Sequence, residues 1–491
     1  WLAAMGSPAW GADARFASKV DRVANWDALH ALMSAWSRQY DKQTIADLAQ
    51  AAHVPSFPLR EPAEQLSSAQ LAHRGFYRSL TLGGRTVQTP GPPFGLPITP
   101  SVGAAAEPKR CVAGPMPLSG IRVLDFSWVI AGPTTTRYLA AMGAEVIKVE
   151  APGRGDPGRA TELHGVLGQA KRGIVLDLKQ SRAVEIARAL ATKCDVLIEN
   201  FATGVMDRLG LGAAALQAIN PDLLYVSASG LGRTGPESHA VAYGTLLQCY
   251  AGFAGLNRHP DVPPRIGLAW LDPMCGLMLA LVVAASIWHC RRLGGAIRID
   301  FSMLEAMLWT MAEPLLAAQL GTPPQPRGSW SECHAPHGAY RCAGDDAWIS
   351  IAVRDDDEWR WLCAIVPALA VMAGYDFGER CARRGAIDAA LSDWARPRQA
   401  QATADELMRA GIAAAALATS RDLVESPHLW ARGFWDTNGT GVLPGLPWRS
   451  SFGRTVGPAP GLGADTEMVL AELLGLSSAA IAALRAAGAL G

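Results

Sequence analysis

The chain has 491 residues, of which 49% are hydrophobic and 18% are charged, a composition typical of a globular protein with several packed cores. Lys plus Arg and Asp plus Glu both number 44, so the formal net charge is zero. This balance excludes a protein that attracts nucleic acid through its overall charge, and it excludes an acidic solvating tail. Any anionic ligand must therefore be bound by local groups.

The cysteines and the longest apolar run indicate a reduced intracellular protein. Nine cysteines are an odd number and form no CxxC pair, so we expect buried, reduced thiols. The longest apolar run, positions 276–288, is shorter than the about 20 residues that a helix needs to cross a bilayer, which predicts a core helix. No secretory signal opens the sequence, and the expected location is the cytoplasm.

Residues 1–85 resemble a later part of the same chain. Five residues recur 358 positions later, Trp36, Leu71, Arg74, Gly75 and Phe76 as Trp394, Leu429, Arg432, Gly433 and Phe434. Because both the residues and their spacing are repeated, we expect 1–85 to form a separate mixed helix and strand unit similar in shape to about 359–445.

The segment 86–118 differs in composition from both of its neighbours. It is rich in Pro and Gly and lacks apolar periodicity. These features predict an extended linker, which we expect to run along the domain that follows rather than hang free.

From residue 119 on, the sequence predicts an α/β domain. Strand candidates at 121–126 and 144–149 flank a helical run that ends at Met142, which is a βαβ unit of about 30 residues. Further apolar strand candidates alternate with helical stretches, and they lie at 173–178, 195–199 and 223–227. This alternation predicts a mostly parallel sheet covered by helices.

A set of short segments carries a family resemblance. They are GIRVLDF (120–126), AGP (131–133), LAAMGAEVIKVE (139–150), KR (171–172), LDLK (176–179), LIENF (197–201), GVMDRLG (204–210) and HAPHGAYR (334–341). Together they resemble the class III CoA-transferase family, also called the CaiB/BaiF family. The resemblance covers residue 118 to about 460 as one full module, and residues 1–100 are similar to the small domain of the same family.

The resemblance implies a fold and an assembly. The fold is a Rossmann-like large domain with a parallel sheet at 119–325, a smaller α+β domain at 326–445 and a return to the large domain at 446–491, preceded by a partial repeat of the small domain. In this family two chains interlock, which implies an interlocked homodimer or an intrachain pseudo-dimer. The sequence begins with Trp1 rather than Met, and we expect it to be a fragment of a tandem fusion.

Asp272 is the candidate catalytic residue. It directly precedes Pro273 and a predicted apolar helix at 274–290, so the sequence alone predicts a helix N-cap followed by proline at the first helical position. A helix N-terminus favours an ionised carboxylate, which is the nucleophile that thioester exchange needs. The resemblance aligns Asp272 with the family's catalytic aspartate.

The resemblance implies that CoA moves from an acyl-CoA donor to a carboxylic acid acceptor through an anhydride and then a thioester on Asp272. The alternatives are an acyl-CoA racemase or isomerase of the same family and a non-catalytic CoA-binding module. The racemases pair the aspartate with a histidine that would fall at Tyr243, which we expect to form a pocket wall. A phenol has a reference pKa of about 10 and is a poor base near neutral pH, which favours the transferase.

Coenzyme A, as the substrate thioester, is the implied ligand, and no metal is expected. Val129, Ile130 and Ala131 lie where the first strand ends and the next helix begins, the edge at which open α/β sheets bind ligands. Asn200 and Arg208 match family positions that contact CoA, and an arginine can hold a phosphate with its guanidinium. Lys171 and Arg172 are weaker candidates for general attraction of the phosphates.

Several positions depart from the family pattern. Ala151 and Val241 stand where related transferases carry an arginine and a lysine, and the residues at 328–333 do not form the glycine-rich loop of well-known members. His334 and His337 lack further ligands at metal-binding spacing. The identity of the donor and acceptor acids therefore cannot be carried over from the family.

Overall fold

The computed structural model describes residues 1–99, 114–437 and 441–490. These residues form two compact units. The first comprises Trp1–Gly255, Ile266–Pro324 and Asp436–Gly491, and the second comprises Leu256–Arg265 and Gln325–Trp435. Residues 100–113 of the expected linker lie outside the described residues.

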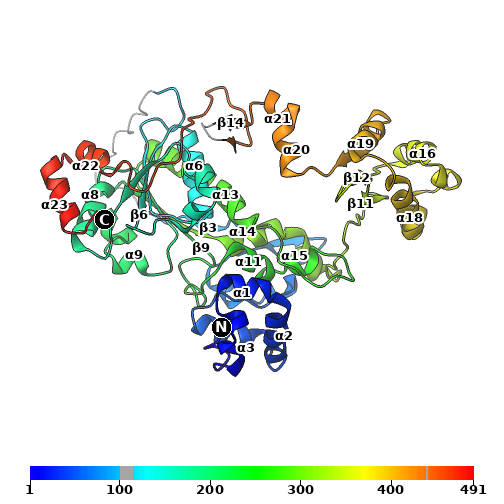
Figure 1. Cartoon of the computed structure of the whole chain (residues 1–491), viewed down its shortest axis with the longest axis horizontal. Coiled ribbons are helices and arrows are strands. Elements are labelled where there is room, and N and C mark those ends of the chain that lie inside the picture. Colours follow the sequence, from blue (N-terminus) through cyan, green and yellow to red (C-terminus); the bar gives the residue numbers. More distant parts are fainter. Residues whose placement is uncertain (100–113, 438–440, 491) are drawn as a thin grey trace. The chain divides into compact units, whose positions relative to one another are not determined.

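The first unit is built on a large sheet (Figure 1). Its parallel strands are β5 (Arg122–Asp125), β6 (Glu145–Glu150), β7 (Arg172–Val175), β8 (Val196–Glu199), β9 (Leu224–Ser229) and β10 (Ala296–Ser302). They lie in the order β7-β6-β5-β8-β9-β10. The chain thus winds outward from β5 in one direction and returns to the other side at β8, which is the doubly wound arrangement. The predicted α/β class with a mostly parallel sheet is confirmed.

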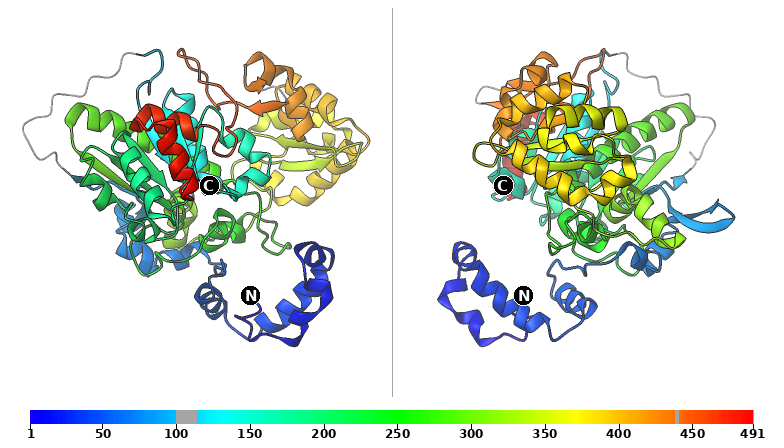
Figure 2. Two further views of the ribbon diagram at one scale, coloured as in Figure 1. Left: turned by 60° about the vertical axis from the view of Figure 1, so that its left-hand side comes forward. Right: turned by 90° about the vertical axis from the view of Figure 1, so that its right-hand side faces the viewer.

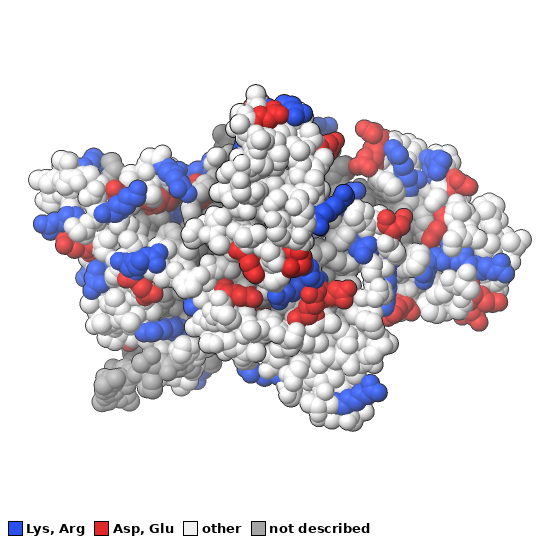
Figure 3. All heavy atoms as spheres, turned by 90° about the horizontal axis from the view of Figure 1, so that it is seen from below, with Lys and Arg blue, Asp and Glu red and all other residues white. Residues whose placement is uncertain are grey.

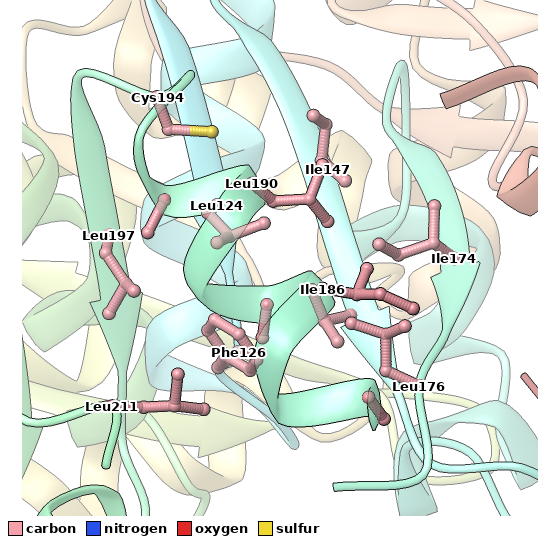
Figure 4. Packing of buried hydrophobic residues seen from close by; sticks show 14 of the residues in the cluster. Leu124, Phe126, Ile147, Ile174, Leu176, Ile186, Leu190, Cys194, Leu197 and Leu211 are labelled. Carbon is pink, nitrogen blue, oxygen red and sulfur yellow. The ribbon is translucent and has the colours of Figure 1, made fainter. Parts of the chain in front are cut away.

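Helices bury both faces of this sheet, which is why its strands are almost continuously apolar. On one face, α8 (Ser181–Ala191) presents Ala183, Ile186 and Leu190 at helical spacing. These side chains pack against Leu124, Ile147, Ile174 and Leu197 of the strands (Figure 4). The C-terminal helices α22 (Thr466–Leu474) and α23 (Ser478–Ala486) join the same core through Val469, Leu470 and Ile481 (Figure 2). Residues 446–491 therefore contain helices that belong to the large domain.

On the other face, α6 (Ala131–Ala141) crosses α13 (Leu271–Leu293) at close range. A Cβ on Gly276 would lie 2.5 Å from Cβ of Thr134, so glycine is required for the two helices to approach. The apolar helix is longer than the run of 13 predicted from the sequence. Its 23 residues are long and apolar enough to cross a membrane by length and composition, but Leu279 and Val283 lie buried in the domain, as in a core helix.

The described part of the 86–118 segment forms strands, which its composition did not predict. β2 (Arg85–Pro90) pairs with β1 (Tyr77–Leu82) in an antiparallel hairpin. β3 (Phe94–Gly95) and β4 (Ile98–Thr99) then pair antiparallel with β10. Residues 94–99 thus lie along the edge of the large sheet, where backbone hydrogen bonds need no apolar periodicity.

Helices in the first 85 residues recur with the same bounds later in the chain. α1 (Lys19–Ala24), α2 (Trp26–Ser37), α3 (Lys42–Ala51) and α5 (Ala69–His73) are each repeated 358 positions later, as α17 (Phe377–Ala382), α18 (Arg384–Ala395), α19 (Ala400–Arg409) and α21 (Pro427–Ala431). α4 (Pro62–Gln65) and α20 (Ser420–Glu425) begin at the same offset. Gly75 and Gly433, which follow α5 and α21, share a left-handed φ of 60° and 62°. The repeated residues thus stand in repeated local structure.

Residues 1–85 belong to the same compact unit as the large sheet, whereas the sequence predicted a separate unit. The reason is a set of polar contacts. Arg74 forms ion pairs with Asp300, at 2.6 Å, and with Glu305, and its side chain is only 6% exposed. Gln70 donates hydrogen bonds to the carbonyl oxygens of Leu231 and Thr234, both at 2.8 Å.

The second unit is a smaller α+β domain. An antiparallel sheet of β11 (His337–Arg341), β12 (Trp348–Ala352) and β13 (Ala413–Ala416) packs against α16 (Asp356–Ile365), α18 and α19. Trp359, Leu391 and Leu407, one from each helix, are fully buried in this core. β14 (Trp435–Thr437) and β15 (Val442–Pro444) follow, and residues from Asp436 on belong to the first unit rather than to the small domain predicted to reach 445.

Shorter elements connect these layers. They are η1 (Ala9–Ala12), η2 (Ala14–Phe16), η3 (Pro157–Ala160), α7 (Leu163–Leu167), α9 (Val205–Arg208), α10 (Ala213–Gln217), α11 (Gly244–Tyr250), α12 (Phe253–Leu256), α14 (Met303–Thr310), α15 (Ala312–Leu320) and η4 (Pro367–Met372). Basic and acidic side chains are interspersed over the face in Figure 3, in keeping with the balanced composition.

Candidate functional site

Asp272 lies in the first turn of α13 and is not its N-cap. The helix begins at Leu271, Trp270 is the N-cap, and no side chain caps the helix. The proline that follows Asp272 thus occupies the third helical position rather than the first. The predicted N-cap role is wrong, so the carboxylate of Asp272 is not held by capping bonds.

The Asp272 carboxylate faces the start of α11. A Cβ on Gly244, the first residue of α11, would lie 2.0 Å from Oδ2 of Asp272, so this position must be glycine for the carboxylate to sit where it does. Gln248 of α11 donates a 3.1 Å hydrogen bond to the carbonyl oxygen of Leu268, just before α13. Tyr243 is the N-cap of α11 and is 55% exposed. Gly244 therefore forms the wall beside the Asp272 carboxylate, and the role of the neighbouring Tyr243 as a pocket wall stays a prediction.

Burial changes the acidity of Asp272. Removal of the carboxyl group from water raises its pKa to about 6, while a hydrogen bond to its own backbone acts weakly in the other direction. At neutral pH the ionised form still outnumbers the protonated form by roughly ten to one. Asp272 is thus a poorly solvated carboxylate, which is more nucleophilic than one stabilised by water and by capping hydrogen bonds.

The crossing of α6 and α13 joins Asp272 to the loop that follows β5. Gly276 is one helical turn beyond Asp272, and a Cβ there would be 2.7 Å from the carbonyl oxygen of Ala131. The hydroxyl of Thr135 donates a 3.1 Å hydrogen bond to the carbonyl oxygen of Gly276. The start of α6 therefore meets the second turn of α13, and the predicted residue Ala131 lies at this helix crossing, one helical turn from Asp272.

The loop between β5 and α6 is held in a strained conformation. Val129 has a φ of +68°, which is unusual for a β-branched residue. Its N–H donates to both carboxylate oxygens of Asp156, at 3.0 and 3.1 Å. The side-chain amide of Asn200 accepts from the N–H of Trp128 at 2.9 Å and donates to its carbonyl oxygen at 3.0 Å. Asn200 thus fixes the loop on which the predicted contact residues lie.

A cavity of about 340 Å³ opens beside this loop. It lies at the carboxyl ends of β5, β6, β7 and β8, and so at the switch point between β5 and β8, where doubly wound sheets bind ligands. Trp128 and Phe201 line it, with ring centroids 6.0 Å apart. Their apolar faces suit a flat aromatic group such as a nucleobase.

Three basic residues line the cavity, and none was predicted from the sequence as a ligand contact: Lys148, which pairs with Asp156 at 3.1 Å, Arg154 and Lys179. Arg154 lies over the ring of Trp128 at 5.4 Å from its centroid, and Lys179 is exposed. Arg154 stands between two glycines in the loop after β6, three residues beyond Ala151, the position at which the family resemblance implies an arginine. The Gly-Arg-Gly pattern predicts a turn at this position, but only the folded loop brings the guanidinium to the Trp128 ring.

Lys171 and Arg172 do not reach this cavity. The ammonium of Lys171 is buried and bonds Asp125 at 3.2 Å and Thr136 at 2.6 Å, and burial lowers its pKa to about 8. Arg172 begins β7, so it lies at the amino end of a parallel strand, where it pairs with Glu145 and Glu472. The prediction that these two residues steer phosphates is not supported by their positions.

Arg208, His334 and His337 are the remaining residues singled out from the sequence. Arg208 ends α9, and its side chain is exposed. The rings of His334 and His337 stack at 6.0 Å in the second unit. Within the described ranges, no group of three or more His, Cys, Asp or Glu residues is arranged to hold a metal ion.

The doubly wound sheet, with a cavity at its switch point, defines a Rossmann-like α/β protein. The model of the family described as CoA-transferase family III matches residues 1–110 and 118–466, and the chain belongs to this family.

Individual relatives agree with this assignment. An acetyl-CoA:oxalate CoA-transferase of Acetobacter aceti is 32% identical over 349 residues, which cover 68% of this chain and 89% of the relative. A probable CoA-transferase of Mycobacterium tuberculosis is 26% identical over 511 residues, which cover 93% of this chain and 63% of that protein. The crystal structure of a CaiB/BaiF family protein from Brucella suis matches with a TM-score of 0.69 and 27% identity, over 73% of this chain and 99% of that one.

Proposed function

We propose that the protein transfers CoA from an acyl-CoA donor to a carboxylic acid acceptor, with Asp272 as the nucleophile. The observation that carries the proposal is the position of the Asp272 carboxylate, which is partly buried, has no role as a helix cap and lies against Gly244, one helical turn from the crossing of α13 with α6. Family membership supports the transfer of CoA in general.

The proposed reaction proceeds through two kinds of covalent intermediate. The Asp272 carboxylate attacks the thioester carbonyl, which forms an acyl-aspartyl anhydride and releases the CoA thiolate. The thiolate attacks the aspartyl carbonyl, releases the donor acid as its carboxylate and forms a thioester on Asp272. The acceptor carboxylate then displaces the thiolate to give a second anhydride, and attack of the thiolate on the acceptor acyl carbon yields the new acyl-CoA and restores Asp272.

The switch-point cavity is the proposed site of the CoA nucleotide. Trp128 and Phe201 offer apolar faces to the adenine, and Arg154 and Lys179 are placed to meet the phosphates. The pantetheine arm would then follow the backbone of Val129 to Ala131 toward Asp272. Asn200 has an indirect role in this arrangement, because its amide holds the Trp128 backbone.

Removal of the nucleophile tests the proposal. We expect Asp272→Ala to abolish exchange of labelled CoA between acetyl-CoA and a panel of mono- and dicarboxylic acids that includes oxalate. Asp261→Ala changes an exposed aspartate and serves as the matched control. A folded Asp272→Ala protein with near-normal turnover would refute the nucleophile. Exchange of the substrate α-proton with solvent deuterium, without CoA transfer, would instead identify an acyl-CoA isomerase.

A further inference from the structure

Residues 57–65 of the N-terminal segment contact α11, the helix whose first residue lies against Asp272. The backbone N–H of Arg60 donates to the carbonyl oxygen of Cys249 at 3.2 Å, and Gln65 donates to the carbonyl oxygen of Tyr250. The ring of Phe57 contacts the ring of Tyr250 at 4.8 Å between centroids, and the Arg60 guanidinium lies 4.3 Å from the same ring centre. The C-terminal end of α11 is thus fastened to residues 57–65.

Gln50 of α3 holds the chain that leads into the other end of α11. Its side-chain oxygen accepts from the N–H of Val241 at 2.9 Å, and its amide nitrogen donates to the carbonyl oxygen of Val241 at 3.1 Å. The same nitrogen donates to the carbonyl oxygen of Ser56 at 2.9 Å. Val241 lies two residues before Tyr243, and Gly244 next to it contacts the Asp272 carboxylate. Gln50 is therefore linked to Asp272 in three stages: its hydrogen bonds to Val241, the short backbone segment from Val241 to Gly244, and the contact of Gly244 with the carboxylate.

The later copy of this segment lacks the side chains that make these contacts. At an offset of 358 positions, Gln50 corresponds to Met408, Phe57 to Ala415, Arg60 to Ala418 and Gln65 to Leu423. Met408 is 50% exposed and cannot accept and donate hydrogen bonds as an amide does. Arg74, by contrast, is matched by Arg432. The pair of hydrogen bonds between the Gln50 amide and Val241, which we call the amide clamp, therefore has no counterpart in the second copy.

We propose that Gln50 is a positioning residue of the Asp272 site. Its amide fixes the backbone at Val241, so that Tyr243 and Gly244 keep the place against which the Asp272 carboxylate rests. The N-terminal repeat therefore takes part in catalysis as a component of the site's wall. This inference rests on the proposed role of Asp272.

Loss of the amide is expected to affect turnover more than binding. Without Gln50, the N–H and C=O of Val241 lose their partner, and the segment before α11 is free to shift relative to α13. A displacement of about 1 Å at a reacting group can lower a rate by up to about a hundred-fold. The cavity residues Trp128 and Arg154 make none of these contacts, so the affinity for the nucleotide should change little.

Gln50→Met is the sharpest test, because it introduces the residue of the second copy at nearly constant volume. We expect kcat for CoA transfer to fall about ten-fold or more, with KM for the acyl-CoA within about two-fold and a melting temperature lowered by only a few degrees. Modification of Asp272 by hydroxylamine in the presence of acyl-CoA should slow in proportion. Gln39→Met is the control, because Gln39 is exposed and bonds the carbonyl oxygen of Ala35 in its own segment.

A second variant separates the accepting and the donating hydrogen bonds of the amide clamp. Gln50→Glu keeps an oxygen that can accept from the Val241 N–H but loses the donor to the Val241 carbonyl, so we expect activity between that of Gln50→Met and the wild type. If Gln50→Met and Gln50→Glu both turn over like Gln39→Met while Asp272→Ala is inactive, the positioning role is wrong and the proposed nucleophile stands. CoA transfer by the Asp272→Ala protein would instead refute the proposed role of Asp272 as the nucleophile.

Discussion

At the scale of single residues, the site depends on glycines and backbone strain as much as on charged groups. Gly244 permits the Asp272 carboxylate to lie against α11, and Gly276 permits α13 to meet α6. Val129 keeps a left-handed φ because Asp156 holds its N–H. The position of the Asp272 carboxylate is therefore set by the close approach of backbone segments at Gly244 and Gly276.

The partly buried Asp272 should make the protein less stable at neutral pH. Its pKa is about 6 in the folded chain and 3.8 in the ordinary reference state, so the folded state binds a proton more tightly. Wild-type stability should therefore decrease as pH rises from about 4 to 6, with the full penalty present above 6. We expect Asp272→Asn to raise the free energy of unfolding by roughly 1–3 kcal/mol at pH 8.

Urea unfolding of both proteins between pH 4 and 8 measures this effect. The difference between Asp272→Asn and the wild type should shrink as pH falls through 6 and disappear near 4. A constant difference over the whole range would show that the asparagine acts through packing rather than through the charge.

At the scale of elements, the sequence predicted what apolar periodicity and strand order can specify. The βαβ unit at 121–149 and the strands at 173–178 and 195–199 were found within a few residues of their predicted positions, because parallel strands buried on both faces are long apolar runs. The strands at 94–95 and 98–99 were missed, because a short edge strand is set by backbone bonds to β10 and not by side chains.

The same contrast applies to the candidate site. The β5 to α6 loop follows from strand order, so Val129, Ile130 and Ala131 could be placed at the ligand-binding edge from the sequence. Lys171 could not be judged in this way, because its pairing with Asp125 joins residues 46 positions apart. Arg154 was missed for a similar reason, since only the folded loop carries it to Trp128.

At the scale of the whole molecule, two copies of a helical segment occupy different environments within one chain. The first copy packs on the large domain through Arg74, whereas the corresponding Arg432 is exposed. The family match to residues 1–110 in addition to 118–466 supports our proposal that the segments are related modules of one family. We further propose that the first copy occupies the place that a partner's small domain would take in an interlocked dimer.

Substitution of the two matched arginines tests how the first copy is held. Arg74→Ala leaves the buried Glu305 carboxylate without its partner, and removal of one member of a buried ion pair costs about 3–5 kcal/mol. We expect unfolding of the first unit at lower urea and faster amide hydrogen exchange in residues 62–76. Arg432→Ala should change stability by less than about 0.5 kcal/mol. Equal effects of the two substitutions would contradict the difference in environment.

If Asp272 is the nucleophile, a covalent intermediate forms on its side chain, and hydroxylamine should intercept that intermediate. The protein is incubated with an acyl-CoA donor and hydroxylamine, and its peptides are then analysed by mass spectrometry. We expect loss of activity together with a hydroxamate on Asp272 that appears only when the donor is present, because an anhydride or thioester of the side chain is an electrophile. CoA transfer that continues at its full rate, with Asp272 unmodified, would contradict it.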